Sequence, residues 1–275
     1  MTGKASHYVD PSPWLPVWDG RSYARNTAHH RRYDADFLTG IDLPSTARIL
    51  DVGCGCGDFT VKLAALVPQG HVVGLDPQQS MIEQAAAVAL PNQSFVLGAA
   101  QQLGVGRAAS ELAGPFDAVV SRAVLHWVPL ADHPGVLAGA ARTMRPGGLL
   151  RLEAGGGDNI ADVVAMLDEI SARYGGPRCP WTFAFAGEYL DLLLDAGFSV
   201  ADGWVRLVAQ RRQFTRAELR GWLTSQCLHA YEHSMAVAAR VGFRAEAIAG
   251  IDRLRRLDGS YDLTYVRLDV RAHRR

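Results

Sequence analysis

Short apolar runs alternate along this chain with segments in which apolar residues recur every three or four positions. The runs predict strands near residues 48–52, 71–76, 94–97, 116–121, 149–153, 198–208 and 261–270. The helical spacing falls between them, at 58–66, from Pro77 onward, at 133–144, at 159–175 and within 185–197. Strands that alternate with helices predict an α/β fold with a mostly parallel sheet.

Helical segments extend this pattern at both ends. Residues 22–38 predict a helix that ends near Gly40, preceded at 1–20 by a proline-rich, aromatic segment that we expect to fold over an apolar surface. Thr215 and Glu218 have the spacing of a capping box and open a mostly helical stretch. We therefore expect an N-terminal cap segment and helix at 1–40 and one domain at 41–275. Helical lid elements are expected at about 159–196 and 215–257.

The charge of the chain gives no sign of a polyanionic partner. Lys and Arg number 28 and Asp and Glu also number 28, so the formal net charge is zero with neutral His. A balanced surface lacks the attraction to phosphate that accompanies binding to nucleic acids or anionic membranes. We expect neither kind of partner, and the oligomeric state stays open.

The apolar runs and the cysteines indicate the cellular compartment expected for this protein. No run reaches the roughly 18 apolar residues of a membrane-spanning helix, and no signal-type apolar core is seen near the start, so we expect a cytoplasmic protein. Cys54 and Cys56 lie in a glycine-rich loop, whereas Cys179 and Cys227 are far apart, which is not a disulfide framework. A single Cys-x-Cys pair lacks zinc spacing, and we expect no metal.

The first predicted strand runs into a glycine-rich loop and then a helix. Asp51 lies near the end of the strand, and Gly53, Gly55 and Gly57 form the loop. Glycines tolerate positive φ and present no Cβ, and the following helix directs unpaired N–H groups at an anionic ligand. The dinucleotide fingerprint needs its third glycine at position 58, where this chain has Asp58. This spacing argues against a nicotinamide oxidoreductase. The alternative is a turn without a ligand.

The second predicted strand ends in an acid, Asp76. A carboxylate at this position can accept two hydrogen bonds from a vicinal diol, such as the ribose of an adenosine cofactor. Pro77 then starts the next helix, so the alternative role of Asp76 is to cap that helix.

Candidate site residues follow the later strands. Arg122, His126 and Trp127 come at or after the end of the fourth strand, and Glu153 ends the fifth. Of these, His126 and Glu153 are candidate catalytic residues. The carboxyl ends of parallel strands share one edge of a sheet, where ligands bind. A third candidate, His30, lies in the N-terminal helix. Each has an alternative: a packed imidazole for His126, a solvated strand end for Glu153, and an ordinary amphipathic helix around His30.

Four segments in order resemble the class I S-adenosylmethionine-dependent methyltransferases. They are the glycine loop at 51–57, the acid-ended strand at Asp76, Phe-Asp-x-Val-x-Ser at 116–121 and Arg-Pro-Gly-Gly at 145–148. Leu-His-Trp-Val at 125–128 is similar to the trans-aconitate and juvenile hormone acid methyltransferase group. The Tyr-x-x-Asn-x-x-x-Gln of that group stands here as Tyr23, Asn26 and His30, which departs from it at the glutamine. The resemblance covers about residues 22–208 and implies a Rossmann-like sheet of seven strands with the last antiparallel.

The resemblance also implies a cofactor, S-adenosyl-L-methionine, with S-adenosyl-L-homocysteine as its product. Its amino-acid end would meet the glycine loop and Arg122, its ribose Asp76, and its adenine the turn at 100–103. The residues implied in binding are Tyr23, Asp51, Gly53, Cys54, Gly55, Gly57, Asp76, Pro77, Ala100, Gln101 and Arg122. The adenine turn departs from the family pattern at Ala99 and Gln101, so backbone groups would carry more of that recognition.

The expected reaction is methyl transfer to a small, largely apolar metabolite, at a carboxylate, a hydroxyl or a carbon. A carboxylate needs no base, whereas a phenol, an amine or a carbon acid needs His126, His30 or Glu153 to remove a proton. The side chains expected around the substrate are Trp127, Trp18, Trp181, Phe183 and Tyr231, and the alternative for each is a place in the core. The alternative for the whole chain is a protein of this fold that transfers no methyl group, either cyclase-like or a binding module.

Overall fold

The computed structural model describes residues 34–105, 112 and 114–275. Seven strands form one sheet in the order β3-β2-β1-β4-β5-β7-β6. Strands β1 to β5 are parallel, and β7 runs antiparallel to both β5 and β6. The bounds are β1 (Arg48–Val52), β2 (His71–Asp76), β3 (Gln93–Leu97), β4 (Phe116–Arg122), β5 (Met144–Gly155), β6 (Phe198–Phe214) and β7 (Tyr261–Arg274). The prediction of an α/β fold whose last strand is antiparallel is confirmed.

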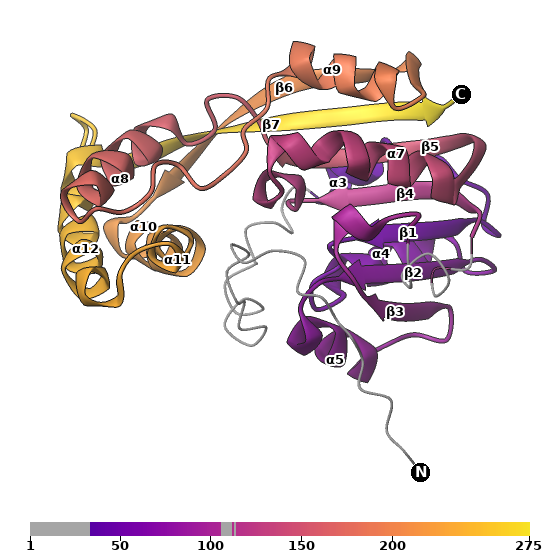
Figure 1. The fold of residues 1–275 in the computed structure, drawn as a ribbon, viewed down its shortest axis with the longest axis horizontal. Coiled ribbons are helices and arrows are strands. Elements are labelled where there is room, and N and C mark those ends of the chain that lie inside the picture. Colours follow the sequence, from indigo (N-terminus) through magenta and orange to yellow (C-terminus); the bar gives the residue numbers. More distant parts are fainter. Residues whose placement is uncertain (1–33, 106–111, 113) are drawn as a thin grey trace.

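Helices cover both faces of the sheet and build a separate group at one end of it (Figure 1). Those near the sheet are α3 (Asp34–Leu38), α4 (Asp58–Leu66), α5 (Gln79–Ala87), η1 (Ala100–Gln102), η2 (Leu125–Trp127), η3 (Leu130–Asp132), α7 (His133–Thr143) and α9 (Ala186–Asp195). The separate group comprises α8 (Ala161–Arg173), α10 (Arg216–Trp222), the π-helical η4 (Leu223–Cys227), α11 (Leu228–His233), α12 (Val237–Ala249) and η5 (Gly250–Leu254).

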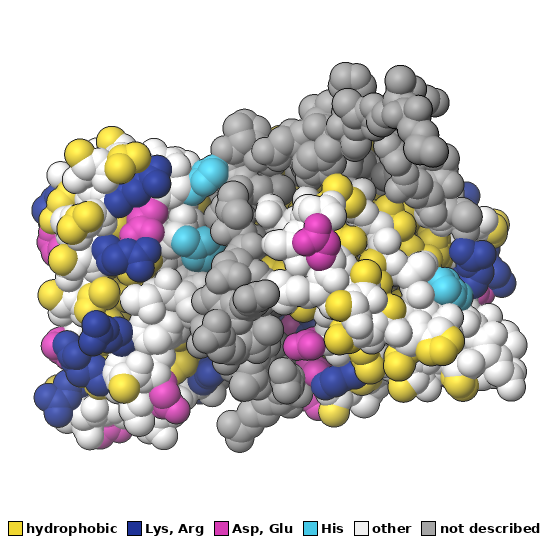
Figure 2. All heavy atoms as spheres, turned by 90° about the horizontal axis from the view of Figure 1, so that it is seen from below, with side chains coloured by type: hydrophobic (Ala, Val, Ile, Leu, Met, Phe, Trp, Pro, Cys, Tyr) yellow, Lys and Arg dark blue, Asp and Glu magenta, His cyan; other side chains and the backbone are white. Residues whose placement is uncertain are grey.

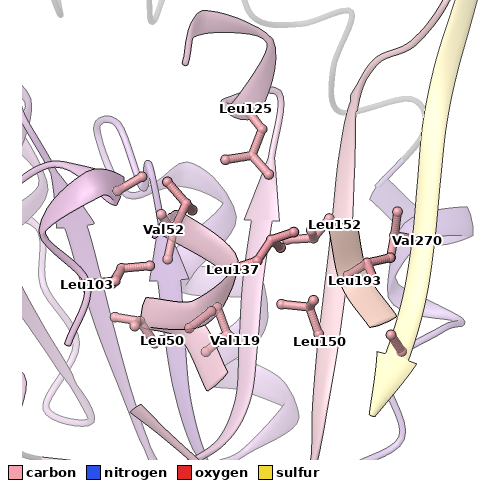
Figure 3. Packing of buried hydrophobic residues seen from close by; sticks show 14 of the residues in the cluster. Leu50, Val52, Leu103, Val119, Leu125, Leu137, Leu150, Leu152, Leu193 and Val270 are labelled. Carbon is pink, nitrogen blue, oxygen red and sulfur yellow. The ribbon is translucent and has the colours of Figure 1, made fainter. Parts of the chain in front are cut away.

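Alternate residues of the central strands face opposite sides of the sheet. Leu50 of β1 belongs to the cluster that contains Leu137 of α7 and Leu193 of α9 (Figure 3). The neighbouring Ile49 belongs to a second cluster, with Phe37 of α3. Because both faces are buried, the parallel strands read as continuous apolar runs, which is why the sequence pattern located them well.

Strands β6 and β7 continue past the end of β5 as a two-stranded ribbon (Figure 1). β7 pairs with β5 only between Arg267 and His273, whereas its pairing with β6 reaches Phe214 and Tyr261. The expected end of the sixth strand at residue 208 was therefore wrong. The expected end of the seventh strand at 270 was also wrong, because β7 continues to Arg274, where it pairs with Phe198. The apolar pattern breaks at 209–213 because one face of the ribbon is exposed, as at Arg211.

The ribbon carries the lobe, which we define as α8, α10, η4, α11, α12 and η5. Its own apolar core joins Tyr265 of the ribbon to Leu167 of α8, Trp222 of α10, Tyr231 of α11 and Phe243 of α12. Helices thus occupy much of the two stretches expected to form a lid. The cap segment expected at 1–40 lies almost wholly outside the described residues.

Helix α9 differs from the expectation for the 159–196 stretch. Tyr189 and Leu193 are fully buried in the sheet cluster, together with Leu137 of α7. The two α9 residues are four positions apart and form one apolar stripe, which packs on the sheet. α9 therefore covers the sheet and is not part of the lobe.

The surface carries charges of both signs. In the face shown by Figure 2, arginine side chains of the lobe are interspersed with Asp and Glu. This arrangement agrees with the zero net charge of the sequence. Within the described ranges, no helix is both long enough and apolar enough to cross a membrane.

Candidate active site at the carboxyl edge of the sheet

A cavity lies at the carboxyl edge of the parallel strands, between the sheet and the lobe. On the sheet side it is lined by Gly53, Gly55, Asp76, Pro77, Gln78, Met81, Arg122, Ala123, Val124, His126 and Trp127. Segments leading to the lobe, and the lobe itself, contribute Asn159, Ile160, Trp181, Phe183, Trp222, Gln226, Cys227, Tyr265 and Arg267. The sequence candidates at the ends of three strands are thus brought together in one space.

The glycine loop enters the cavity in a conformation that side chains disfavour. Gly53, Gly55 and Gly57 have φ of +77°, +54° and +86°, in the left-handed region. A Cβ at Gly53 would lie 2.1 Å from Cγ2 of Val124, so this glycine is also required by close packing. The loop therefore presents bare backbone to the cavity, and Asp58 begins α4 directly after it.

Asp76 joins the loop to the next helix while facing the cavity. One carboxylate oxygen accepts the N–H of Gly55 at 3.0 Å, and the other accepts the N–H of Gln78 at 2.9 Å. Each oxygen has a further lone pair for a ligand hydroxyl, so supporting the start of α5 leaves acceptor capacity for a diol. Burial raises the pKa of Asp76 to about 6, although both N–H bonds favour the charged form.

Asp51 supports the loop from behind and does not line the cavity. Its carboxylate accepts a hydrogen bond of 2.7 Å from the hydroxyl of Thr60 in α4, and only 2% of the residue is exposed. Burial raises its pKa to about 7. Cys54 and Gly57 are likewise outside the cavity lining, so the structure divides the loop into ligand-facing and supporting positions.

Arg122 lines the cavity as the centre of an ionic group. Its guanidinium contacts Asp34 of α3 and, through Nε at 3.3 Å, the carboxylate of Glu153. Burial disfavours the charge of Asp34, but hydrogen bonds from Lys62 and Arg122 outweigh it and lower its pKa. Glu153 forms an ion pair with Arg122 and does not line the cavity. It is therefore not placed to remove a proton from a molecule bound there.

His126 is neutral at physiological pH. Its Nδ1 accepts the N–H of Gly155 at 3.2 Å, which identifies Nε2 as the protonated nitrogen. Desolvation lowers its pKa to about 3, and the positive charge of Arg267 adds to this effect. With one nitrogen accepting and the other carrying hydrogen, His126 lines the cavity as a poor proton acceptor.

An aromatic cluster forms the lobe side of the cavity. Trp127 stacks on His229, with ring centroids 5.7 Å apart, and meets Trp181 edge-on at 5.9 Å. Trp181 in turn stacks on Phe183 at 5.8 Å. Tyr231 packs behind Trp181, is fully buried and donates its hydroxyl to Asp168 at 2.7 Å, so it does not line the cavity.

The other expected site residues lie elsewhere or are not described. Ala100 is buried and Gln101 donates to Asp132 at 3.3 Å, and neither lines the cavity. Tyr23, His30 and Trp18 lie outside the described residues. Within the described ranges, no group of three His, Cys, Asp or Glu side chains is placed to hold a metal ion.

Several polar residues that line the cavity were not predicted from the sequence. Gln78 lies two positions after Asp76, and Asn159 lies two positions before the start of α8. Gln226 comes from the π-helical turn η4. Such turns are frequent at functional sites, but no sequence pattern predicts them. Arg267 lies in a strand where alternate residues are polar, so nothing in the sequence separates it from an exposed arginine.

Comparisons with known proteins agree with this geometry. Residues 49–148 match the family model described as a methyltransferase domain. A trans-aconitate 2-methyltransferase of Methylobacterium nodulans is 31% identical over 68% of this chain and 67% of its own length. An uncharacterized methyltransferase of Schizosaccharomyces pombe is 28% identical over 94% of this chain and 98% of its own. The crystal structure of YcgJ from Bacillus subtilis shares the fold, with a TM-score of 0.59 at 16% identity, covering 90% of this chain and 99% of that one.

The fold, the glycine loop and these matches define a class I methyltransferase, an enzyme that uses S-adenosylmethionine. The chain belongs to the trans-aconitate methyltransferase-like group of that family.

Proposed function

We propose that this enzyme transfers the methyl group of S-adenosylmethionine to a carboxylate oxygen of a small organic acid. The observation that carries the proposal is the state of His126, whose pKa of about 3 and bond from Gly155 make it a poor base. A carboxylate is already ionised at neutral pH, so it needs no base. The names of the trans-aconitate 2-methyltransferase relatives support an acid acceptor.

The proposed cofactor site fits the groups on the sheet side of the cavity. The bare backbone at Gly53 and Gly55 would admit the amino-acid and ribose portions, and Asp76 would accept the ribose diol. Arg122 lies where it would add positive charge near the cofactor carboxylate. Asp51, Cys54 and Gly57 would act by holding the loop. S-adenosylmethionine supplies a methyl group on a positively charged sulfur, which is an activated leaving group.

The chain's own contribution would be placement and exclusion of water. Trp127, Trp181 and Phe183 line the acceptor side, so the apolar part of an acid would pack on aromatic surface. Methyl transfer needs the nucleophile about 3 to 3.5 Å from the carbon, so rate depends on how firmly this wall holds the acid. The sequence predicted a largely apolar metabolite as the acceptor. We propose more specifically an acid that has an apolar portion.

Assaying an acid panel tests the proposed function. The acceptors would be trans-aconitate, adipate and heptanoate, with 1-heptanol and heptylamine as matched neutral and basic compounds. Methyl esters should form from one or more acids, detected as a mass gain of one methyl group together with S-adenosylhomocysteine. Faster methylation of the alcohol or the amine would contradict carboxylate transfer.

Cofactor binding should weaken as the pH falls through about 6. The ribose hydroxyls donate to the charged form of Asp76, so protonation removes acceptor capacity, and affinity is full above the pKa and lost below it. Below this pKa the dissociation constant should rise about tenfold per pH unit. Calorimetry with S-adenosylhomocysteine between pH 5 and pH 8 measures this. An Asp76→Asn variant should bind more weakly with a much shallower pH dependence, and an unchanged slope would assign the titration to another group, such as Asp51.

Trp127→Ala should reduce turnover of the accepted acid by about 10- to 100-fold while leaving S-adenosylhomocysteine affinity within about twofold. The indole stacks on His229 and meets Trp181 edge-on, on the lobe side of the cavity. Phe185→Ala is a matched control, because Phe185 is an aromatic residue that is 52% exposed and does not line the cavity. Equal losses of turnover and cofactor affinity in Trp127→Ala would contradict the assignment.

A further inference from the structure

Arg267 is a cavity-lining cation at the point where the sheet becomes the ribbon. Its backbone is in register with Gly155 at the end of β5 and with Val208 of β6. The residue is only 9% exposed, and its side chain lines the cavity. The guanidinium lies 5.1 Å from the ring centroid of Tyr265, which supports one face of it.

No acid in the described part of the chain pairs with Arg267, unlike the other buried arginines. Arg122 has Asp34 and Glu153, and Arg151 has Asp269. Asp269 is two residues from Arg267 on the same strand, but its carboxylate already accepts bonds from Arg151, Trp204 and Arg206. The nearest acid along the strand is thus committed elsewhere.

A buried guanidinium without an acid is costly, because desolvation is not offset by an ion pair. Arginine does not lose its proton in proteins, so it cannot relieve this cost by becoming neutral. A second cavity-lining residue is Gln226, whose buried Nε2 has no hydrogen-bond partner among the described residues. Two donors in one cavity wall fit an anionic ligand group, and the guanidinium fork matches a carboxylate in particular.

We propose that Arg267 binds a carboxylate of the acceptor other than the one that receives the methyl group. This inference rests on the proposed carboxylate methylation. A reacting carboxylate loses its negative charge as the ester forms, so an ion pair with it would stabilise the ground state more than the transition state. A second carboxylate keeps its charge throughout and can remain bound to Arg267. Arg267 is therefore a specificity-determining residue that selects acids with at least two carboxylates.

Adipate and heptanoate test this role, because they are similar in length and differ in the second carboxylate. Arg267→Met should lower kcat/KM for adipate by about 100-fold and change that for heptanoate by less than about threefold. Arg267→Lys keeps the charge and loses the fork, so it should fall between Met and wild type. Arg211→Met, on the exposed face of the same ribbon, is the matched control and should leave both acids unaffected.

Two further measurements separate ligand binding from a structural role. The melting temperature of Arg267→Met should not fall, because the change removes a buried charge that no described acid neutralises. S-adenosylhomocysteine affinity should also stay unchanged. An equal loss with both acids, or a destabilised variant, would overturn the assignment of Arg267.

If neither adipate nor heptanoate is methylated, they are not acceptors of this enzyme. A direct measurement of anion binding then tests the role of Arg267. Adipate and inorganic phosphate would then be titrated into the protein loaded with S-adenosylhomocysteine. Adipate binding that disappears in Arg267→Met would support an anion site, and tighter phosphate binding would reassign it to phosphate. Binding of neither anion to the wild-type protein would overturn the inference.

Discussion

Gly55→Val should fold and bind S-adenosylhomocysteine more than about 100-fold more weakly than wild type, a loss of about 2.7 kcal/mol or more. Gly55 has a φ of +54°, lines the cavity and donates its N–H to Asp76 at 3.0 Å. A β-branched residue strains the backbone there by about 1 to 3 kcal/mol. Relieving that strain would move the N–H of residue 55 away from Asp76. The variant would then lose both the exposed backbone that the cofactor contacts and the hydrogen bond that orients the Asp76 carboxylate.

Gly147→Val is the matched control for backbone strain. Gly147 has a φ of +75°, does not line the cavity, and a Cβ there would meet nothing within 4 Å. This variant should lose some stability and keep full cofactor affinity, measured by calorimetry alongside circular dichroism. Wild-type affinity in a folded Gly55→Val protein would remove the glycine loop from the proposed cofactor site.

Asp269→Ala should lower the free energy of unfolding by about 3 to 5 kcal/mol. Asp269 of β7 is 6% exposed and accepts hydrogen bonds from Trp204 at 2.8 Å and from Arg206 at 2.9 Å, besides its ion pair with Arg151. Arg151 is 3% exposed, so the substitution would leave a buried guanidinium without its acid. Urea unfolding followed by circular dichroism measures the loss.

Two comparisons identify the ion pair as the cause. Arg206→Met removes a partner whose side chain is 57% exposed and should cost less than about 1 kcal/mol. The double variant Arg151→Met with Asp269→Leu should recover most of the lost stability, because no unpaired charge remains. A double variant as unstable as Asp269→Ala alone would show that packing at this position matters more than charge.

The ribbon is the feature that gives the cavity its second wall. A sheet of this kind offers the glycine loop and Asp76 at its carboxyl edge, but these groups all lie on the proposed cofactor side. β7 adds Arg267, at the end of its pairing with β5, and Tyr265, in the ribbon beyond it, to the cavity lining, and the ribbon carries the lobe with its aromatic residues. Acceptor selection is therefore expected to depend on the ribbon and lobe, and cofactor binding on the sheet.

Local patterns predicted the sheet side well. β1 and β2 have the expected bounds because both strands are buried on two faces and end at punctuating residues, Gly53 and Pro77. The ribbon was less predictable, because one exposed face interrupts its apolar pattern. The lobe helices were expected, but the packing of α9 on the sheet was not. An apolar stripe shows that a helix has a buried face, but it does not show which surface buries that face.

The sequence by itself determined the fold class, the glycine loop and the acid-ended strand, because backbone conformation and strand limits depend on nearby residues. Only the tertiary structure decided the state of each buried charge. Arg151 meets Asp269 across 118 positions of sequence, and Arg122 meets Asp34 across 88. Arg267 has the same chemistry and lines the cavity, but no acid in the described part of the chain pairs with it. Strand register and burial set these differences, and both arise from contacts between segments that no local pattern relates.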